Sequence, residues 1–150
     1  MRVWVITAAL VGGLLAGAEV SGKVVAASVS PDSLVLLASS DISWTPGSRP
    51  GFARAPLWGD RRTGPYGEFQ RYDGGYQLPL HFHSNELRGL IISGTWVIEV
   101  RGQAAKELPA GSYFSVPGKT QHVDTCKSGA VCVLHLTGEL PLDLIPVTPD

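Results

Sequence analysis

Clusters of basic residues are missing from this sequence. Its 150 residues include 12 lysines and arginines against 13 acidic residues, a formal net charge of −1, and the basic residues form no run or stripe. Proteins that bind nucleic acids neutralise backbone phosphates with clustered lysine and arginine. The charge pattern therefore excludes that class, and we expect no nucleic-acid partner.

Amphipathic helical periodicity is missing as well. No stretch sustains apolar residues at i, i+3, i+4 and i+7, whereas short extended segments alternate with glycine and proline turns. The sequence therefore predicts an all-β fold, either a sandwich or a barrel. We expect a tight hairpin at Ser93-Gly94, because glycine tolerates a positive φ. The expected strands are residues 67–72, 77–83, 88–92, 96–100, 112–116, 122–126 and 130–136.

Only one long apolar run is present, and it lies at the N-terminus. A basic start, an apolar run over residues 3–15 and the small residues Ala16-Gly17-Ala18 are typical of a secretory signal peptide. A spanning helix needs about 20 apolar residues, so we expect residues 1–18 to be removed on export, with an uncleaved anchor as the alternative. No cysteine follows the small residues, so no lipid anchor is expected.

The export signal divides the chain into three parts. Residues 1–18 are the expected signal peptide, residues 19–40 a lead that forms either a linker or a first edge strand, and residues 41–150 a single domain. We therefore expect a secreted or periplasmic protein with no stable membrane anchor after cleavage.

Histidine is scarce, and three of the four histidines form a pattern. His81 and His83 are two residues apart, so on a strand both side chains project from the same face. His122 supplies a third imidazole if a later strand lies beside the first. Divalent metals bind imidazole nitrogen at about 2.0–2.1 Å, and three protein ligands leave a position open. The spacing predicts that these histidines bind one divalent transition metal, either Zn, Fe, Ni or Cu.

Periodicity does not distinguish the two faces of this histidine strand. If His81 and His83 face the interior, Leu80 and Phe82 lie outside and need cover from the N-terminal lead or from a second subunit. The second option predicts a homodimer. In the alternative arrangement, Leu80 and Phe82 fill the core and the imidazoles are solvated.

The pattern around the histidines resembles the two motifs of the cupins. The first motif is Gly, five residues, His-x-His, three or four residues, Glu, six residues, Gly. Glu86 comes one residue before the usual position of the acid. In the second motif, Cys126 replaces the usual asparagine and Lys119 the second glycine. The matching residues are Gly75, His81, His83 and Gly94 in the first motif, and Gly111, Pro117 and His122 in the second.

The chain is also similar to a group of small bacterial cupin-like proteins. That group carries its acid one position early, so the resemblance implies Glu86 as a fourth candidate metal ligand. A more distant resemblance is to the cupin domain of zinc-binding anti-sigma factors. These resemblances imply a cupin-type double-stranded β-helix, a jelly-roll barrel, for residues 41–150. The shared segments are Leu57-Trp58-Gly59-Asp60, Arg88-Gly89, Ser93-Gly94-Thr95, Gly111-Ser112-Tyr113 and the paired cysteines.

Two functions are compatible with such a site, because a fold by itself does not specify a reaction. One is an exported metal-dependent enzyme that acts on a small molecule, with Glu86 as a ligand or general base. The other is a non-catalytic periplasmic or secreted protein that binds or senses a small ligand or a metal. Spacing reveals no Ser-His-Asp or Cys-His nucleophile arrangement, so the sequence favours neither.

The chain has only two cysteines, Cys126 and Cys132. We expect them to face each other across a hairpin and to form a disulfide, because exported proteins fold in oxidising compartments. One alternative is two free thiols. The other is that Cys126 joins His122 as a metal ligand, since residues i and i+4 of a strand share a face.

Overall fold

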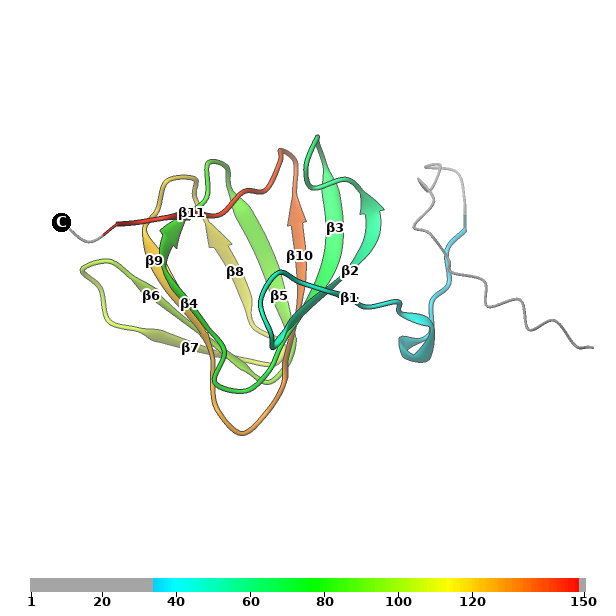
Figure 1. Ribbon diagram of the computed structural model, residues 1–150, viewed down its shortest axis with the longest axis horizontal. Helices are drawn as coiled ribbons and strands as arrows, with labels where there is room; N and C mark the ends of the chain where they lie inside the picture. The colour runs from blue at the N-terminus through cyan, green and yellow to red at the C-terminus, as the bar shows by residue number, and fades with distance from the viewer. Residues whose placement is uncertain (1–33, 149–150) are drawn as a thin grey trace, which may run out of the picture.

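The computed structural model describes residues 34–148. Its strands form two antiparallel sheets around a common interior (Figure 1), which confirms the all-β prediction. The six-stranded sheet contains, in order, β1 (Thr45–Pro46), β2 (Phe52–Gly59), β3 (Tyr66–Tyr72), β10 (Cys132–Gly138), β5 (Leu87–Ser93) and β8 (Tyr113–Val116). The five-stranded sheet contains β11 (Ile145–Pro146), β4 (Gln77–Phe82), β9 (His122–Cys126), β6 (Thr95–Val100) and β7 (Lys106–Pro109). A short 3-10 helix, Ser39–Asp41, precedes them.

The chain changes sheet at almost every connection. From β3 to β11, only β6 and β7 follow each other within one sheet. This alternation between two facing antiparallel sheets is the jelly-roll arrangement. It brings β4 and β9, which are distant in the sequence, side by side in the five-stranded sheet (Figure 1).

The prediction of a hairpin at Ser93-Gly94 is wrong. This turn connects β5 of one sheet to β6 of the other, and the two strands do not pair. Gly94 has a φ of +75°, and a Cβ there would lie 2.7 Å from the carbonyl oxygen of Val131. Glycine is therefore needed at this sharp corner between the sheets.

Inward side chains of both sheets form one hydrophobic core. Buried residues alternate with exposed or half-buried ones along the whole of β10 and along β5 as far as Ile92. Burying each large apolar side chain stabilises the fold by roughly 1.5–3 kcal/mol. The core members are Tyr66, Tyr72, Leu87, Ile91, Trp96, Ile98, Phe114, Val116, Leu134, Leu136 and the two cysteines.

All seven expected segments are strands, with ends within two residues of those predicted, but β1, β2, β7 and β11 were not predicted. β2 includes Pro56, which lacks a backbone N–H, and its pairing with β3 shifts register between Pro56 and Trp58. β1 and β11 are two-residue edge strands that each contain a proline. In strands this short or irregular, apolar and polar residues do not alternate regularly, so the sequence pattern does not reveal them.

The disulfide between Cys126 and Cys132 is present, so that prediction is confirmed. The prediction that the two cysteines face each other across a hairpin is wrong, because β9 and β10 belong to different sheets. The bond closes the corner between them, with 5.8 Å between the two Cα atoms. It therefore links the five-stranded sheet to the six-stranded one, and Cys126 is not available as a metal ligand.

The signal peptide at residues 1–18 and most of the expected lead lie outside the described residues. Residues 34–38 contain no strand, and Leu34, Val35, Leu36 and Leu37 are exposed. Among residues 34–148, no helix has the length and apolarity needed to cross a membrane.

Candidate metal centre

The three motif histidines meet in the interior of the fold. His81 lies on β4, His83 directly follows that strand, and His122 begins β9. His81 and His122 are register partners across the β4–β9 pair. Their exposed fractions are 0% for His81, 6% for His83 and 1% for His122. The interior orientation of the His-x-His pair is thus the one adopted, and the solvated arrangement is not.

Backbone carbonyls fix the orientation of each imidazole. Nδ1 of His81 lies 2.8 Å from the carbonyl oxygen of Pro79, and Nδ1 of His122 lies 2.8 Å from that of Thr120. Nδ1 of His83 is hydrogen-bonded to the carbonyl oxygen of Asp143. A carbonyl can only accept, so each Nδ1 carries the proton and donates it. Every Nε2 is then left with a lone pair, the tautomer typical of metal-binding histidines.

The free nitrogens fit one divalent ion. The candidate ligand atoms of the three histidines all lie within 4.8 Å of one another. Nε2 of His81 and Nε2 of His83 are buried without a hydrogen-bond partner. Unpaired buried polar atoms are costly, and an ion at their centre would satisfy them.

A buried acid, Asp124, lies beside this cluster and was not predicted. It lies two residues after His122 on β9, and its Oδ2 is 3.4 Å from Nε2 of His122 and 3.7 Å from Nε2 of His81. The alternation that placed His81 beside His83 could have found it, because His122 and Asp124 share the inward face of one strand.

Burial lowers the pKa values of the histidines, whereas the Asp124 carboxylate raises them. Burial lowers the pKa of His81 and of His83, because the charged imidazolium loses its hydration. Burial also acts on His122, but the Asp124 carboxylate outweighs it and raises the pKa of His122 above its usual value. His122 is therefore the imidazole of the three that holds a proton most firmly.

Glu86, the fourth predicted ligand, lies outside this cluster. It is exposed on the link between β4 and β5, and its carboxylate accepts hydrogen bonds of 2.6 Å from Arg88 and from Ser115. These bonds lower the pKa of Glu86, the Arg88 bond more strongly. The structure therefore brings together three of the four predicted ligands and gives Glu86 surface partners.

A small cavity of about 30 Å³ adjoins the histidine cluster. His83 and Asp124 contribute to its wall, as do Tyr72 and Gln70 of the opposite sheet. The remaining lining is apolar and includes Leu78, Leu87, Trp96, Phe114, Leu134, Leu136 and Leu142. Since one water needs about 10–15 Å³, the cavity admits only a very small group in this conformation.

A chain of polar side chains runs from this cavity along the inward face of β3. Tyr72 donates to Oε1 of Gln70, and the Gln70 amide donates to Glu68 over 2.6 Å. Arg61 donates to the same carboxylate over 3.0 Å, and Arg54 lies 3.8 Å from its other oxygen. A carboxylate can only accept, so the Gln70 amide nitrogen must point at Glu68. The Gln70 amide oxygen then points at Tyr72 and accepts its hydroxyl proton. The Tyr72 oxygen therefore keeps its lone pairs free toward the cavity.

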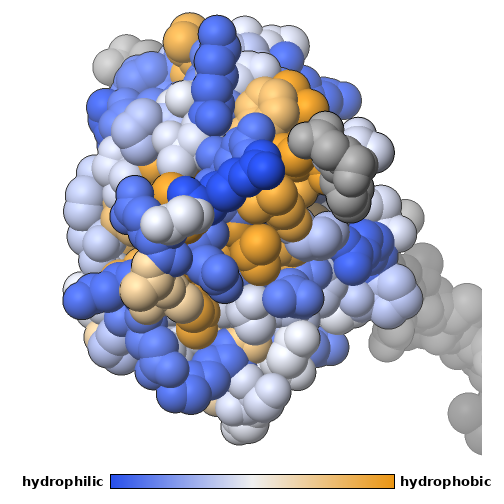
Figure 2. Space-filling model, turned by 90° about the vertical axis from the view of Figure 1, so that its left-hand side faces the viewer, coloured by the Kyte–Doolittle hydropathy of each residue, from blue (hydrophilic) through white to orange (hydrophobic). Residues whose placement is uncertain are grey.

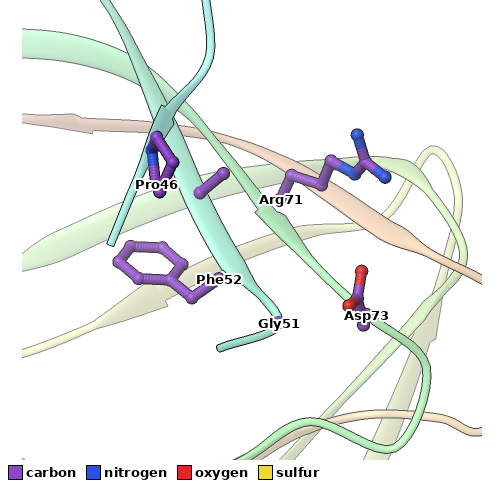
Figure 3. Close-up of a pocket in the computed structure, with 6 residues that line it drawn as sticks. Pro46, Gly51, Phe52, Arg71 and Asp73 are labelled. Atoms are coloured by element: carbon purple, nitrogen blue, oxygen red, sulfur yellow. The ribbon is translucent and has the colours of Figure 1, made fainter. Parts of the chain in front are cut away.

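A larger open depression of about 220 Å³ lies elsewhere, on the outside of β1, β2 and β3. In Figure 3, Pro46 lies near the Phe52 ring on one side, and Arg71 and Asp73 lie on the other. None of its lining residues belongs to the histidine cluster. The histidine cluster is thus interior and separate from this surface depression.

Apolar side chains also lie on the outer faces of both sheets. Leu80 and Phe82 of β4 are half-buried, and Figure 2 shows apolar side chains grouped on the side of the five-stranded sheet. On the other sheet, Leu90 and Tyr113 are exposed. The fourth histidine, His135, lies on that sheet too, in edge-to-face contact with Phe69 at 5.4 Å, away from the metal centre.

Solved structures with this arrangement of strands are cupins. The polyketide cyclase RemF from Streptomyces resistomycificus has a TM-score of 0.66 at 14% identity, over 79% of this chain and 88% of its own. An RmlC-like cupin from Shewanella frigidimarina has a TM-score of 0.55 at 20% identity, over 70% and 91%. The Rhodobacter sphaeroides complex of SigE with the anti-sigma ChrR gives 0.55 at 17% identity, over 68% and 51%. These likenesses confirm the cupin fold, which the matched chain of the anti-sigma complex shares.

The sequence comparison agrees with the fold. No curated protein matches the chain. A family model described as "Domain of unknown function (DUF4437)" matches residues 25–142, well over half of the sequence. The chain therefore belongs to this cupin-like family.

Proposed function

We propose that this protein is an exported cupin that binds one divalent transition ion, Zn, Fe, Ni or Cu, through His81, His83 and His122. The observation that carries the proposal is the orientation of the three imidazoles. Each donates its Nδ1 proton to a backbone carbonyl, and the Nε2 atoms of His81 and His83 have no partner. Two buried imidazole nitrogens without a partner are expensive unless an ion satisfies them.

We further propose that the ion serves an enzyme acting on a small molecule. When bound, a divalent ion of this kind supplies a Lewis acid that polarises an oxygen of the substrate. The adjoining cavity favours a ligand that has a small apolar part, which contacts Trp96 and Phe114, and a donor group that reaches the Tyr72 oxygen. One structural relative is named as a polyketide cyclase, which is consistent with small-molecule chemistry in this fold.

The size of the cavity favours a second function. A volume of about 30 Å³ holds no more than about two waters. A non-catalytic protein that binds or senses a metal needs no larger space. Turnover requires that the interior open, for example at Leu142, which precedes β11 and lines the cavity.

Metal content and substrate binding separate these functions. Protein purified from its native compartment should contain about one equivalent of metal per chain, measured by inductively coupled plasma mass spectrometry. His81→Ala, His83→Ala and His122→Ala should lose most of it, while His135→Ala, the matched control on the outer face, should retain it. Full occupancy in the His122→Ala protein would overturn the three-histidine site. An enzyme should also bind small oxygen-donor ligands in a metal-dependent manner, whereas a metal sensor should not.

The export proposal is supported by the disulfide between Cys126 and Cys132, because such bonds persist in oxidising compartments. We also propose a homodimer in which a second copy covers apolar outer-face residues such as Leu80 and Phe82. Light scattering coupled to size-exclusion chromatography should give twice the chain mass. A monomer at all concentrations would reject the dimer without affecting the metal centre.

A further inference from the structure

A carboxylate that the cupin motif does not provide lies beside two of the three histidines. Asp124 lies on β9, where buried and half-buried residues alternate strictly, so it points inward with His122 and Cys126. Its Oδ2 is 3.4 Å from Nε2 of His122 and 3.7 Å from Nε2 of His81. The acid therefore lies beside two of the three imidazoles, those of His81 and His122.

Asp124 has no lysine or arginine partner for its buried charge among the described residues. It is 6% exposed, and its Oδ1 makes no hydrogen bond. Within residues 34–148, its ion-pair contacts are only with His81 and His122, and no lysine or arginine reaches it. A carboxylate loses its hydration on burial, and the loss is compensated only by a cation or by several donors. A metal ion supplies the missing positive charge.

The distances match those between two ligands of one ion. Ligand atoms at about 2.0–2.1 Å from an ion in tetrahedral geometry lie about 3.3–3.4 Å from each other. The two Oδ2 to Nε2 distances, 3.4 and 3.7 Å, are close to this value. A hydrogen bond between nitrogen and oxygen is usually shorter, about 2.9 Å. The spacing thus suits shared coordination better than direct pairing.

We propose that Asp124, and not Glu86, is the carboxylate ligand of the ion held by His81, His83 and His122, a step that rests on the proposed metal centre. The Glu86 carboxylate is occupied on the surface by Arg88 and Ser115. The resulting set of three nitrogens and one oxygen contains no thiolate, since both cysteines are in the disulfide. It therefore favours a divalent ion over Cu(I), which prefers soft sulfur ligands.

The test compares metal affinity and coordination in the full chain, using Zn²⁺ in competition with a chromophoric chelator and Co²⁺ as a spectroscopic probe. Asp124→Asn keeps the shape of the side chain but removes its charge, and it should weaken Zn²⁺ binding by about 100-fold or more, since even the loss of an outer-shell partner costs about 10–100-fold. The visible absorption of bound Co²⁺ should also change. Glu86→Gln, the matched control, should bind like the wild type.

Two further measurements separate the possible failures. Asp124→Glu restores the carboxylate and should recover part of the affinity lost in Asp124→Asn, which a folding defect would not reproduce. Wild-type affinity and an unchanged Co²⁺ spectrum in Asp124→Asn would overturn Asp124 as a ligand while leaving the three-histidine site intact. No Zn²⁺ binding by the wild type, or equal binding by His122→Ala, would instead overturn the metal centre itself.

Discussion

His81 and His122 are direct cross-strand partners, with ring centroids 4.3 Å apart, although 40 residues separate them in the chain. Their pairing depends on the antiparallel contact between β4 and β9, where the register shifts between Leu78 and His81. The shift allows both imidazoles to face the interior beside His83. One sheet contact therefore assembles the whole histidine cluster.

Metal binding should stabilise the folded protein. A ligand that binds only the native state, present at 100 times its dissociation constant, adds about 2.7 kcal/mol. Adding Zn²⁺ to metal-free protein should therefore raise the melting temperature in calorimetry, and a chelator should reverse the change. His135→Ala should respond like the wild type and His83→Ala should not. A melting temperature independent of Zn²⁺ would contradict the proposed site.

Metal affinity should fall as the pH decreases, and His122 should determine where the fall begins. Burial lowers the pKa of His122, but Asp124 outweighs this effect and raises it. A metal ion must therefore compete with a proton on His122 at pH values above the usual histidine pKa of about 6.5. His81 and His83, whose pKa values are lowered by burial, stay neutral to lower pH. Competition titrations across pH 5–8, roughly the range in which histidines titrate, should show this.

In Asp124→Asn, burial is opposed only by the hydrogen bond of His122 to the Thr120 carbonyl, so the pKa of His122 should drop and the pH midpoint of metal binding should move lower. An unchanged midpoint would mean that another group sets the pH dependence.

Loss of the disulfide should destabilise the fold without disrupting the histidine cluster. In the chain-entropy model, closing so short a loop is worth roughly 2–3 kcal/mol. We expect the double variant Cys126→Ser/Cys132→Ser to lose about that much in urea unfolding, and reductant to affect the wild type alone. Two reactive thiols per chain in the unfolded, unreduced protein would show that the bond does not form.

Arg61 should contribute strongly to the free energy of unfolding, because it donates a hydrogen bond to Glu68, which is only 2% exposed. Arg61→Met leaves this carboxylate with the Gln70 amide and the more distant Arg54. Breaking a buried pair on one side typically costs 3–5 kcal/mol, and Arg54 compensates in part, so we expect a loss of about 3 kcal/mol. Arg62→Met, which affects the exposed pair with Asp60, is the control and should leave the urea midpoint unchanged.

Export predicts a shorter native chain. If residues 1–18 are a cleaved signal peptide, the intact mass of protein from its native compartment should correspond to a start at or near Glu19. Full-length chain in a cytosolic fraction would contradict export.

The histidine cluster could be predicted from the sequence where the spacing of two residues decides which way their side chains point. The two-residue separation of His81 and His83 places them on one face of any strand, and His122 was identified as the third member through its spacing and motif. The same alternation connects His122 to Asp124, but a single aspartate on a strand is not distinguished from a surface residue until its burial is known. Glu86 shows the converse, since the resemblance to small bacterial cupin-like proteins suggested it as a ligand, while its contacts are with Arg88 and Ser115.

By itself the sequence determined the all-β class, most strand positions, the three histidines and the paired cysteines, because alternation and turn residues act over a few neighbouring positions. Only the tertiary structure decided which strands share a sheet. The turn at Ser93-Gly94 and the segment between Cys126 and Cys132 looked like hairpins, yet both cross from one sheet to the other. A short turn can join two strands of one sheet or cross between two sheets. Which of these forms depends on burying the inward faces of both sheets in one core. The same long-range requirement placed Asp124 beside His81 and His122.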